Sequence, residues 1–101
     1  MLTLRFMVAL AQFNATTQTF ESSPTQLNLS QITEAVDILM DFYQMNLDIS
    51  GHYLDSVADT IIGRLYALVA NPNIAIMYMK ELLDIIVYVG ESRESSINAN
   101  G

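Results

Sequence analysis

The segment from Ile74 to Val89 constrains the fold of this chain more than any other part of the sequence. Only Lys80, Glu81 and Asp84 interrupt its apolar residues. On a helix of 3.6 residues per turn, these three side chains project within roughly a third of the circumference. On a typical surface helix it is the apolar residues that cover only about a third of the circumference, and polar residues cover the rest. Here the polar residues cover the smaller part. We therefore expect either the central helix of a bundle or a surface that binds a partner.

Composition favours association with another chain. The sequence has 101 residues, of which 51% are hydrophobic and 15% are charged, whereas globular proteins average roughly 25% charged residues. A domain of this size has a high ratio of surface to volume and cannot hide so much apolar side chain internally. The sequence therefore predicts an oligomer, with a homodimer as the simplest form, or a tight complex with another protein.

The charge balance excludes one class of partner. Eleven acidic and four basic residues give a net charge of −7, and the basic residues form no run, so direct binding of nucleic acid is not expected. An acidic surface suits either solubility or a basic partner protein. The chain has no cysteine, which fits a reducing compartment, and we predict a cytoplasmic location. The apolar run 6–11 is shorter than a typical signal core, and charges within 74–89 argue against a membrane span.

The first quarter of the chain is ambiguous. Apolar residues of segment 2–13 alternate as in a strand, with 16–21 as a possible hairpin partner, but they also fit one face of a helix. Helix is slightly favoured, because the segment contains good helix formers. Residues 14–27 are polar, rich in Ser and Thr, and contain Pro24. This composition predicts a loop in which only Phe20 docks.

The next two helices have clearer signals. Asn28 is a candidate N-cap with Gln31 as its reciprocal partner, and Leu27 with Ile32 can form a hydrophobic staple. Ser50 is a candidate cap for the helix after that. The residues expected to be buried in the first of these helices are Ile32, Ala35, Val36, Leu39, Phe42 and Tyr43. Those expected in the second are Leu54, Val57, Ala58, Ile61, Leu65 and Leu68.

The last helix is predicted to start at Asn71-Pro72, because proline suits the first helical position. It is predicted to end at Gly90, a natural residue after a helix C-terminus. Residues 91–101 are rich in Ser and Asn and are expected to be disordered. The predicted fold is therefore all-α: a small antiparallel bundle of three to four helices in one domain, 1–90, with an irregular or β-hairpin N-terminal segment as the alternative for its start.

Catalysis is not expected. His52, Asp55 and Asp59 share one helical face, but a metal site needs further ligands that the sequence does not supply. Glu34, Asp37 and Asp41 lack the Glu-x-x-His pattern of helical di-metal sites. The sequence also has no Gly-rich phosphate loop and no nucleophile elbow. We therefore expect no enzyme activity, no cofactor and no metal.

The leading functional hypothesis is a non-enzymatic interaction module, resembling a chaperone, regulator or inhibitor in size and composition, of the kind found in phage and bacteria. It would bind a protein partner through an exposed apolar helix. The expected interface residues are Ile74, Ile76, Met77, Tyr78, Met79, Leu82, Leu83, Ile86 and Tyr88. One alternative is an immunity or antitoxin-type inhibitor that meets a basic partner with an acidic docking face. The acidic residues are Glu34, Asp37, Asp41, Asp55 and Asp59. A second alternative is a homo-oligomeric subunit of a larger assembly.

Overall fold

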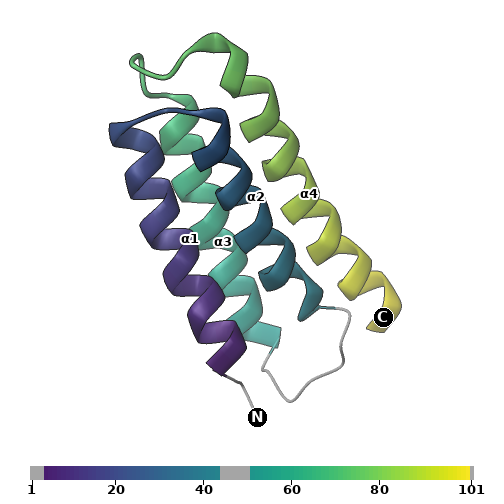
Figure 1. Ribbon diagram of the computed structural model, residues 1–101. Helices are drawn as coiled ribbons and strands as arrows, with labels where there is room; N and C mark the ends of the chain where they lie inside the picture. The colour runs from purple at the N-terminus through teal and green to yellow at the C-terminus, as the bar shows by residue number, and fades with distance from the viewer. Residues whose placement is uncertain (1–3, 44–50, 101) are drawn as a thin grey trace.

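The computed structural model describes residues 4–43 and 51–100, which form four α-helices. These are α1 (Leu4–Ser22), α2 (Gln26–Asp41), α3 (Gly51–Val69) and α4 (Ile76–Asn100). Consecutive helices run in opposite directions, so both termini lie at the same end of the molecule (Figure 1). The predicted all-α bundle is confirmed. No strand occurs in the described part of the chain, so the alternative of an N-terminal β-hairpin was wrong.

The bundle consists of two helical hairpins. Helix α1 packs against α2, α3 packs against α4, and the two hairpins also meet through α2 and α4. Because α2 and α4 both run towards the end that holds the chain termini (Figure 1), this shared contact is parallel. Residues of both helices line a groove along this contact.

The core contains the two apolar stripes predicted for α2 and α3. All six residues expected to be buried in α3 are buried, and so are the expected residues of α2 apart from the half-buried Tyr43. Helix α1 contributes three phenylalanines spaced seven residues apart, Phe6, Phe13 and Phe20, each at most 1% exposed. This seven-residue spacing keeps the three rings on one face of the helix.

The same phenylalanine spacing explains why the predicted loop at 14–27 was wrong. Helix α1 continues through this polar sequence as far as Ser22, because Phe20 extends the buried face by two further turns. The hydroxyls of Thr16 and Thr19 donate to the backbone carbonyls four residues earlier. Such bonds let short polar side chains remain within a helix. The connection to α2 is therefore much shorter than the sequence suggested.

Helix α2 begins earlier than predicted, and with a different cap. The Oγ1 atom of Thr25 accepts a hydrogen bond from the Asn28 backbone N–H at 3.1 Å. Asn28 is therefore inside the first turn, where its side-chain amide donates to the Ser23 carbonyl. Leu27 is 69% exposed, so it does not form the expected staple with the buried Ile32. The candidate cap Ser50 of the next helix lies outside the described residues.

Both predicted ends of α4 also differ from the structure. Asn71 caps a turn rather than a helix, because its Oδ1 accepts from the Asn73 backbone N–H, and α4 starts only at Ile76. At the other end, Gly90 lies inside the helix, and the expected disordered tail is helical as far as Asn100. Arg93 stabilises this extension by pairing with Asp55 and Asp59 of α3. The sequence did not reveal this contact between distant segments.

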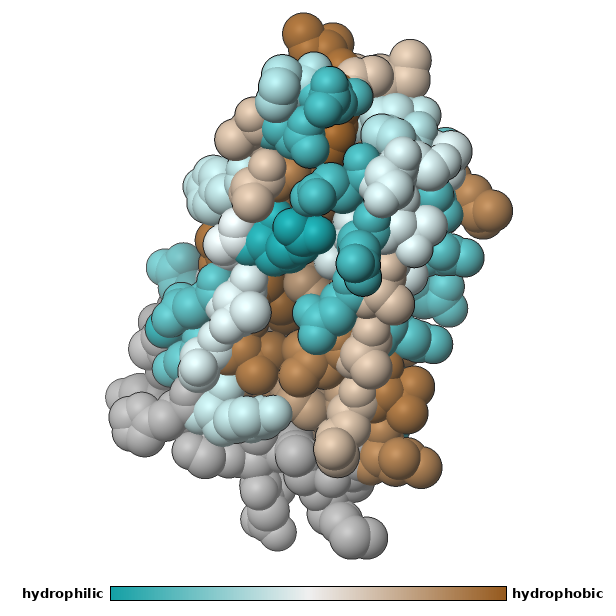
Figure 2. All heavy atoms as spheres, turned by 90° about the vertical axis from the view of Figure 1, so that its left-hand side faces the viewer, coloured by the Kyte–Doolittle hydropathy of each residue, from teal (hydrophilic) through white to brown (hydrophobic). Residues whose placement is uncertain are grey.

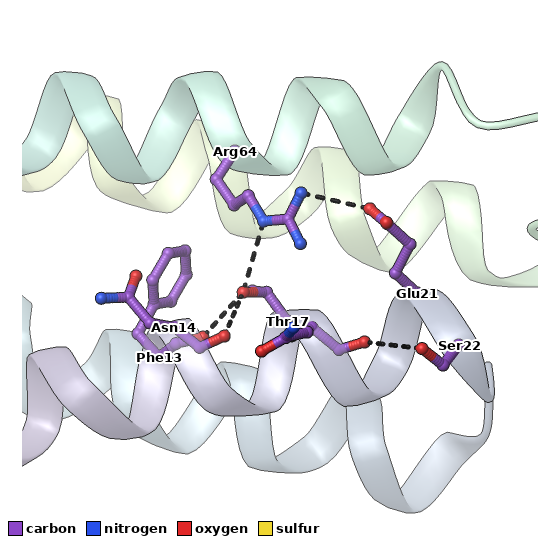
Figure 3. A network of polar contacts seen from close by, with 7 residues as sticks. Phe13, Asn14, Thr17, Glu21, Ser22 and Arg64 are labelled. Carbon is purple, nitrogen blue, oxygen red and sulfur yellow. Dashed lines mark hydrogen bonds and ion pairs between the residues drawn. The ribbon is translucent and has the colours of Figure 1, made fainter.

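A polar network links α1 to α3 (Figure 3). Arg64 on α3 forms an ion pair with Glu21 at 3.1 Å, and its Nε donates to the Thr17 hydroxyl at 3.5 Å. Thr17 is a buried polar residue, and its hydroxyl in turn donates to the Phe13 carbonyl at 2.9 Å. Because the hydroxyl and guanidinium have partners, this network fixes the relative position of the two helices without an unpaired buried charge.

Candidate functional site

The residues predicted to form an apolar interface separate into core and surface. Ile74, Leu82 and Ile86 are at most 8% exposed and belong to the core, so their assignment to a binding surface was wrong. The remaining predicted residues are exposed or half-buried: Ile76 (82% exposed), Met77 (70%), Leu83 (43%), Tyr88 (38%), and the half-buried Tyr78 and Met79. The physical reason is that α4 packs against both α2 and α3, which bury one side of it only.

Three of the exposed apolar residues of α4 lie in a line that we call the outer stripe: Ile76, Leu83 and Val87. Val87 is 55% exposed and was missed by the sequence reasoning, although its position four residues after Leu83 could have indicated it. Lys80 lies between Ile76 and Leu83 in this stripe and pairs with Asp84 at 3.4 Å. Steps of four, three and four residues from Ile76 to Val87 are those of a coiled-coil seam, with Lys80 at one seam position.

A groove of about 270 Å³ lies between α2 and α4. We call it the α2–α4 groove. Its lining combines apolar groups with three carboxylates: Thr33, Val36, Asp37, Glu81, Asp84, Ile85 and Tyr88. The side-chain amide of Gln26 on α2 donates a hydrogen bond of 3.2 Å to the Glu81 carboxylate on α4. The groove therefore offers an apolar interior with an acidic rim.

Burial and nearby carboxylates both affect the titration of groups in this groove. Partial burial, followed by repulsion from Asp41, raises the pKa of the Asp37 carboxyl above its usual value. Burial also raises the pKa of the Tyr88 phenol, with a further contribution from the negative charge of Asp37. In both groups burial disfavours the charged form more than the neighbouring charges do. A positive charge brought to the rim would be stabilised.

The five acidic residues predicted to form one docking face are dispersed over the bundle. Glu34 lines a separate polar groove towards α1, whereas Asp37 faces α4. Asp55 and Asp59 both pair with Arg93, and Asp55 also accepts a hydrogen bond from the Tyr43 hydroxyl at 3.0 Å. These two aspartates stabilise contacts between helices. Because only Asp37 lines the α2–α4 groove, the acidic surface is smaller than predicted and includes two residues that the prediction omitted, Glu81 and Asp84.

A second group of exposed apolar side chains lies at the start of α1: Leu4, Met7 and Val8. Figure 2 views the α1 side of the bundle, where hydrophobic residues gather mainly in the lower half. This group borders residues 1–3, which are outside the described part of the chain. We therefore assign the candidate site to α4 and α2, where the surroundings of each side chain are described.

Two further classes of site can be assessed in the described residues. No group of three His, Cys, Asp or Glu side chains among the described side chains of 4–43 and 53–95 is arranged to hold a metal ion. The His52 side chain lies outside this set. Among the helices of residues 4–43 and 51–100, none is long and apolar enough to cross a membrane. The arrangement around α4 combines exposed apolar side chains with carboxylates.

Comparison of the chain with protein-family models, curated proteins and solved structures gives no match. The fold alone defines the class, which is a four-helix bundle of two antiparallel hairpins.

Proposed function

We propose that this protein is a non-enzymatic interaction module that binds a helix of another polypeptide on the outer face of α4. The observation that carries this proposal is the exposure of Ile76, Leu83 and Val87 in one line, each at least 43% accessible. Single exposed apolar residues are common on protein surfaces. Several on one helix face, with coiled-coil spacing, favour a partner that covers them.

The outer stripe suits a helix as its occupant. In a coiled coil, each apolar residue of one helix inserts between four residues of the facing helix. Leu83 and Val87 provide two such positions, and Met77, next to Ile76 at the start of α4, adds an adaptable side chain. The α2–α4 groove, whose lining residue Asp84 lies three residues before Val87, gives a further apolar side chain of the partner a place to insert. The complete surface thus resembles the helix-in-groove mode of recognition.

The folded core accounts for most of the apolar residues from which the sequence predicted an oligomer. Most large apolar residues of the described chain pack against each other within one copy, so the core itself needs no second chain. The apolar surplus is concentrated at α4 and at the start of α1. Self-association as a homodimer and a cytoplasmic location remain predictions, supported respectively by this surplus and by the absence of cysteine.

The test uses two synthetic helical peptides of about three heptads, both with Leu at the two seam positions of each heptad. One carries Lys and the other Glu at the flanking positions, which discourages each peptide from pairing with itself. We expect at least one peptide to bind, and Leu83→Asp to abolish that binding. Tyr66→Asp is the matched control, because Tyr66 is also an exposed apolar residue (54%) but lies on α3. Failure of both peptides to bind, or unchanged binding by Leu83→Asp, would contradict the proposal.

A further inference from the structure

The α2–α4 groove carries information about the charge of the partner. Its apolar part consists of Val36, Ile85 and the ring of Tyr88. The carboxylates lie on both sides, with Asp37 on α2 and Glu81 and Asp84 on α4. Asp84, which lines the groove, is also a neighbour of the outer stripe on the helix surface, because it lies three residues before Val87 and pairs with Lys80. A helix on the outer stripe that leans towards α2 would therefore bring one row of its side chains to the edge of this groove.

The positive charge on this side of the bundle does not balance the rim. Lys80 is the cation that pairs there, with Asp84 at 3.4 Å, and both side chains are largely exposed. An ion pair of this kind is weak and is easily exchanged for another partner. Partial burial, and secondarily the neighbouring Asp41, raises the pKa of Asp37. A ligand with positive groups at this rim would therefore gain electrostatic energy as well as apolar contact.

We propose that the occupant of the outer stripe and the α2–α4 groove is a basic amphipathic helix, with an apolar side chain in the groove and Lys or Arg residues against Asp37, Glu81 and Asp84. This inference rests on the proposed function and specifies the partner's chemistry. A second copy of this chain is the less suitable occupant. It would bring a further net charge of −7 and face the acidic rim with acidic residues, and like charges brought together across an interface oppose association.

The two peptides separate this inference from the proposed function. We expect the Lys-flanked peptide to bind at least about tenfold more tightly than the Glu-flanked peptide at low ionic strength, since charge complementarity governs both encounter and specificity. This preference should decrease as salt is added, because screening acts on exposed charges. Fluorescence anisotropy of the labelled peptides measures both effects. Equal affinity of the two peptides would overturn the basic character of the partner while leaving the helix-binding function intact.

Charge-neutralising variants locate the effect. The double substitution Asp37→Asn with Glu81→Gln should weaken binding of the Lys-flanked peptide several-fold and leave the Glu-flanked peptide unaffected or slightly tighter. Glu34→Gln is the matched control, because Glu34 is exposed on α2 but lines the groove towards α1. An equal loss in the control would show that net charge alone is responsible, and would overturn the assignment to this groove.

Light scattering of the protein without peptide completes the test. We expect the same mass for the wild-type protein and for Leu83→Asp at the concentrations used for binding. A dimer that excludes both peptides and that Leu83→Asp dissociates would assign the outer stripe to a second copy, and would overturn the proposal.

Discussion

Leu82 and Leu83 are adjacent in the sequence but have opposite environments, and replacing each by Ala tests the orientation of α4. Leu82 is fully buried (0% exposed) among core residues, whereas Leu83 is 43% exposed in the outer stripe. Truncating a fully buried leucine costs about 2–5 kcal/mol, which is a large part of the roughly 5–15 kcal/mol that stabilises a typical domain. Truncating an exposed leucine on a helix changes stability by about 0.5 kcal/mol or less, since Ala is also the better helix former.

The two variants have the same composition, so each is the control for the other. Urea unfolding followed by far-UV circular dichroism should show a much lower midpoint for Leu82→Ala and nearly the wild-type midpoint for Leu83→Ala. In a thermal scan, 1 kcal/mol corresponds to about 4–8 °C for a domain of this size, so Leu82→Ala should melt at least about 10 °C lower. Equal destabilisation by the two substitutions would refute the reasoning, because it would mean that the outer stripe is itself buried.

Three further predictions concern stability. Gly90→Ala should raise the unfolding free energy by about 1 kcal/mol, because Gly90 is inside α4 and an added Cβ would contact nothing; a loss in urea unfolding would contradict this. Asp37→Asn should raise the melting temperature at pH 7 but not near pH 3, since burial and Asp41 raise the pKa of Asp37 in the folded state, making its charge unfavourable only where it is ionised. Tyr43→Phe should reduce the loss of stability above about pH 10. There tyrosine ionises in the unfolded chain, whereas burial and the hydrogen bond to Asp55 raise the pKa of Tyr43 in the fold and keep it protonated. An unchanged dependence of the unfolding free energy on pH in this range would contradict the prediction.

Helices were predicted correctly where apolar residues recur at helical spacing. This part of the prediction does not depend on the signals that start or end a helix. The six residues predicted in α3, from Leu54 to Leu68, are all buried, because the spacing of three and four residues defines one face regardless of neighbours. Phe20 shows the limit of this reasoning. Its distance of seven residues from Phe13 is typical of a helix. The polar residues around it are typical of a loop, and the prediction followed them.

The ends of helices were predicted less well, because tertiary contacts can outweigh local signals. Glycine commonly follows the end of a helix. Helix α4 nevertheless continues past Gly90, because Arg93 pairs with Asp55 and Asp59 on α3. Such a pairing depends on the relative position of α3 and α4 and is absent from any local pattern. Similarly, the N-cap of α2 is Thr25 and not the predicted Asn28, and both residue types can cap a helix.

The candidate site was only partly predictable. The sequence indicated that α4 is too apolar to be covered by one neighbour, and the exposed Ile76, Met77 and Leu83 agree with that. It could not divide the helix into a core side and a free side, because this depends on α4 packing against both α2 and α3. The groove is a consequence of that packing. It combines Asp37 with Glu81, two residues more than forty positions apart in the chain.

The central claim is that a basic helix binds across the outer stripe and the α2–α4 groove, and mapping the Lys-flanked peptide by NMR tests it most directly. In a titration of the isotope-labelled protein, we predict that amide shifts will concentrate on residues 76–91 of α4 and 33–37 of α2. They should be absent in Leu83→Asp. Shifts concentrated on the exposed faces of α1 and α3, or no shifts at peptide concentrations that saturate binding, would contradict the claim.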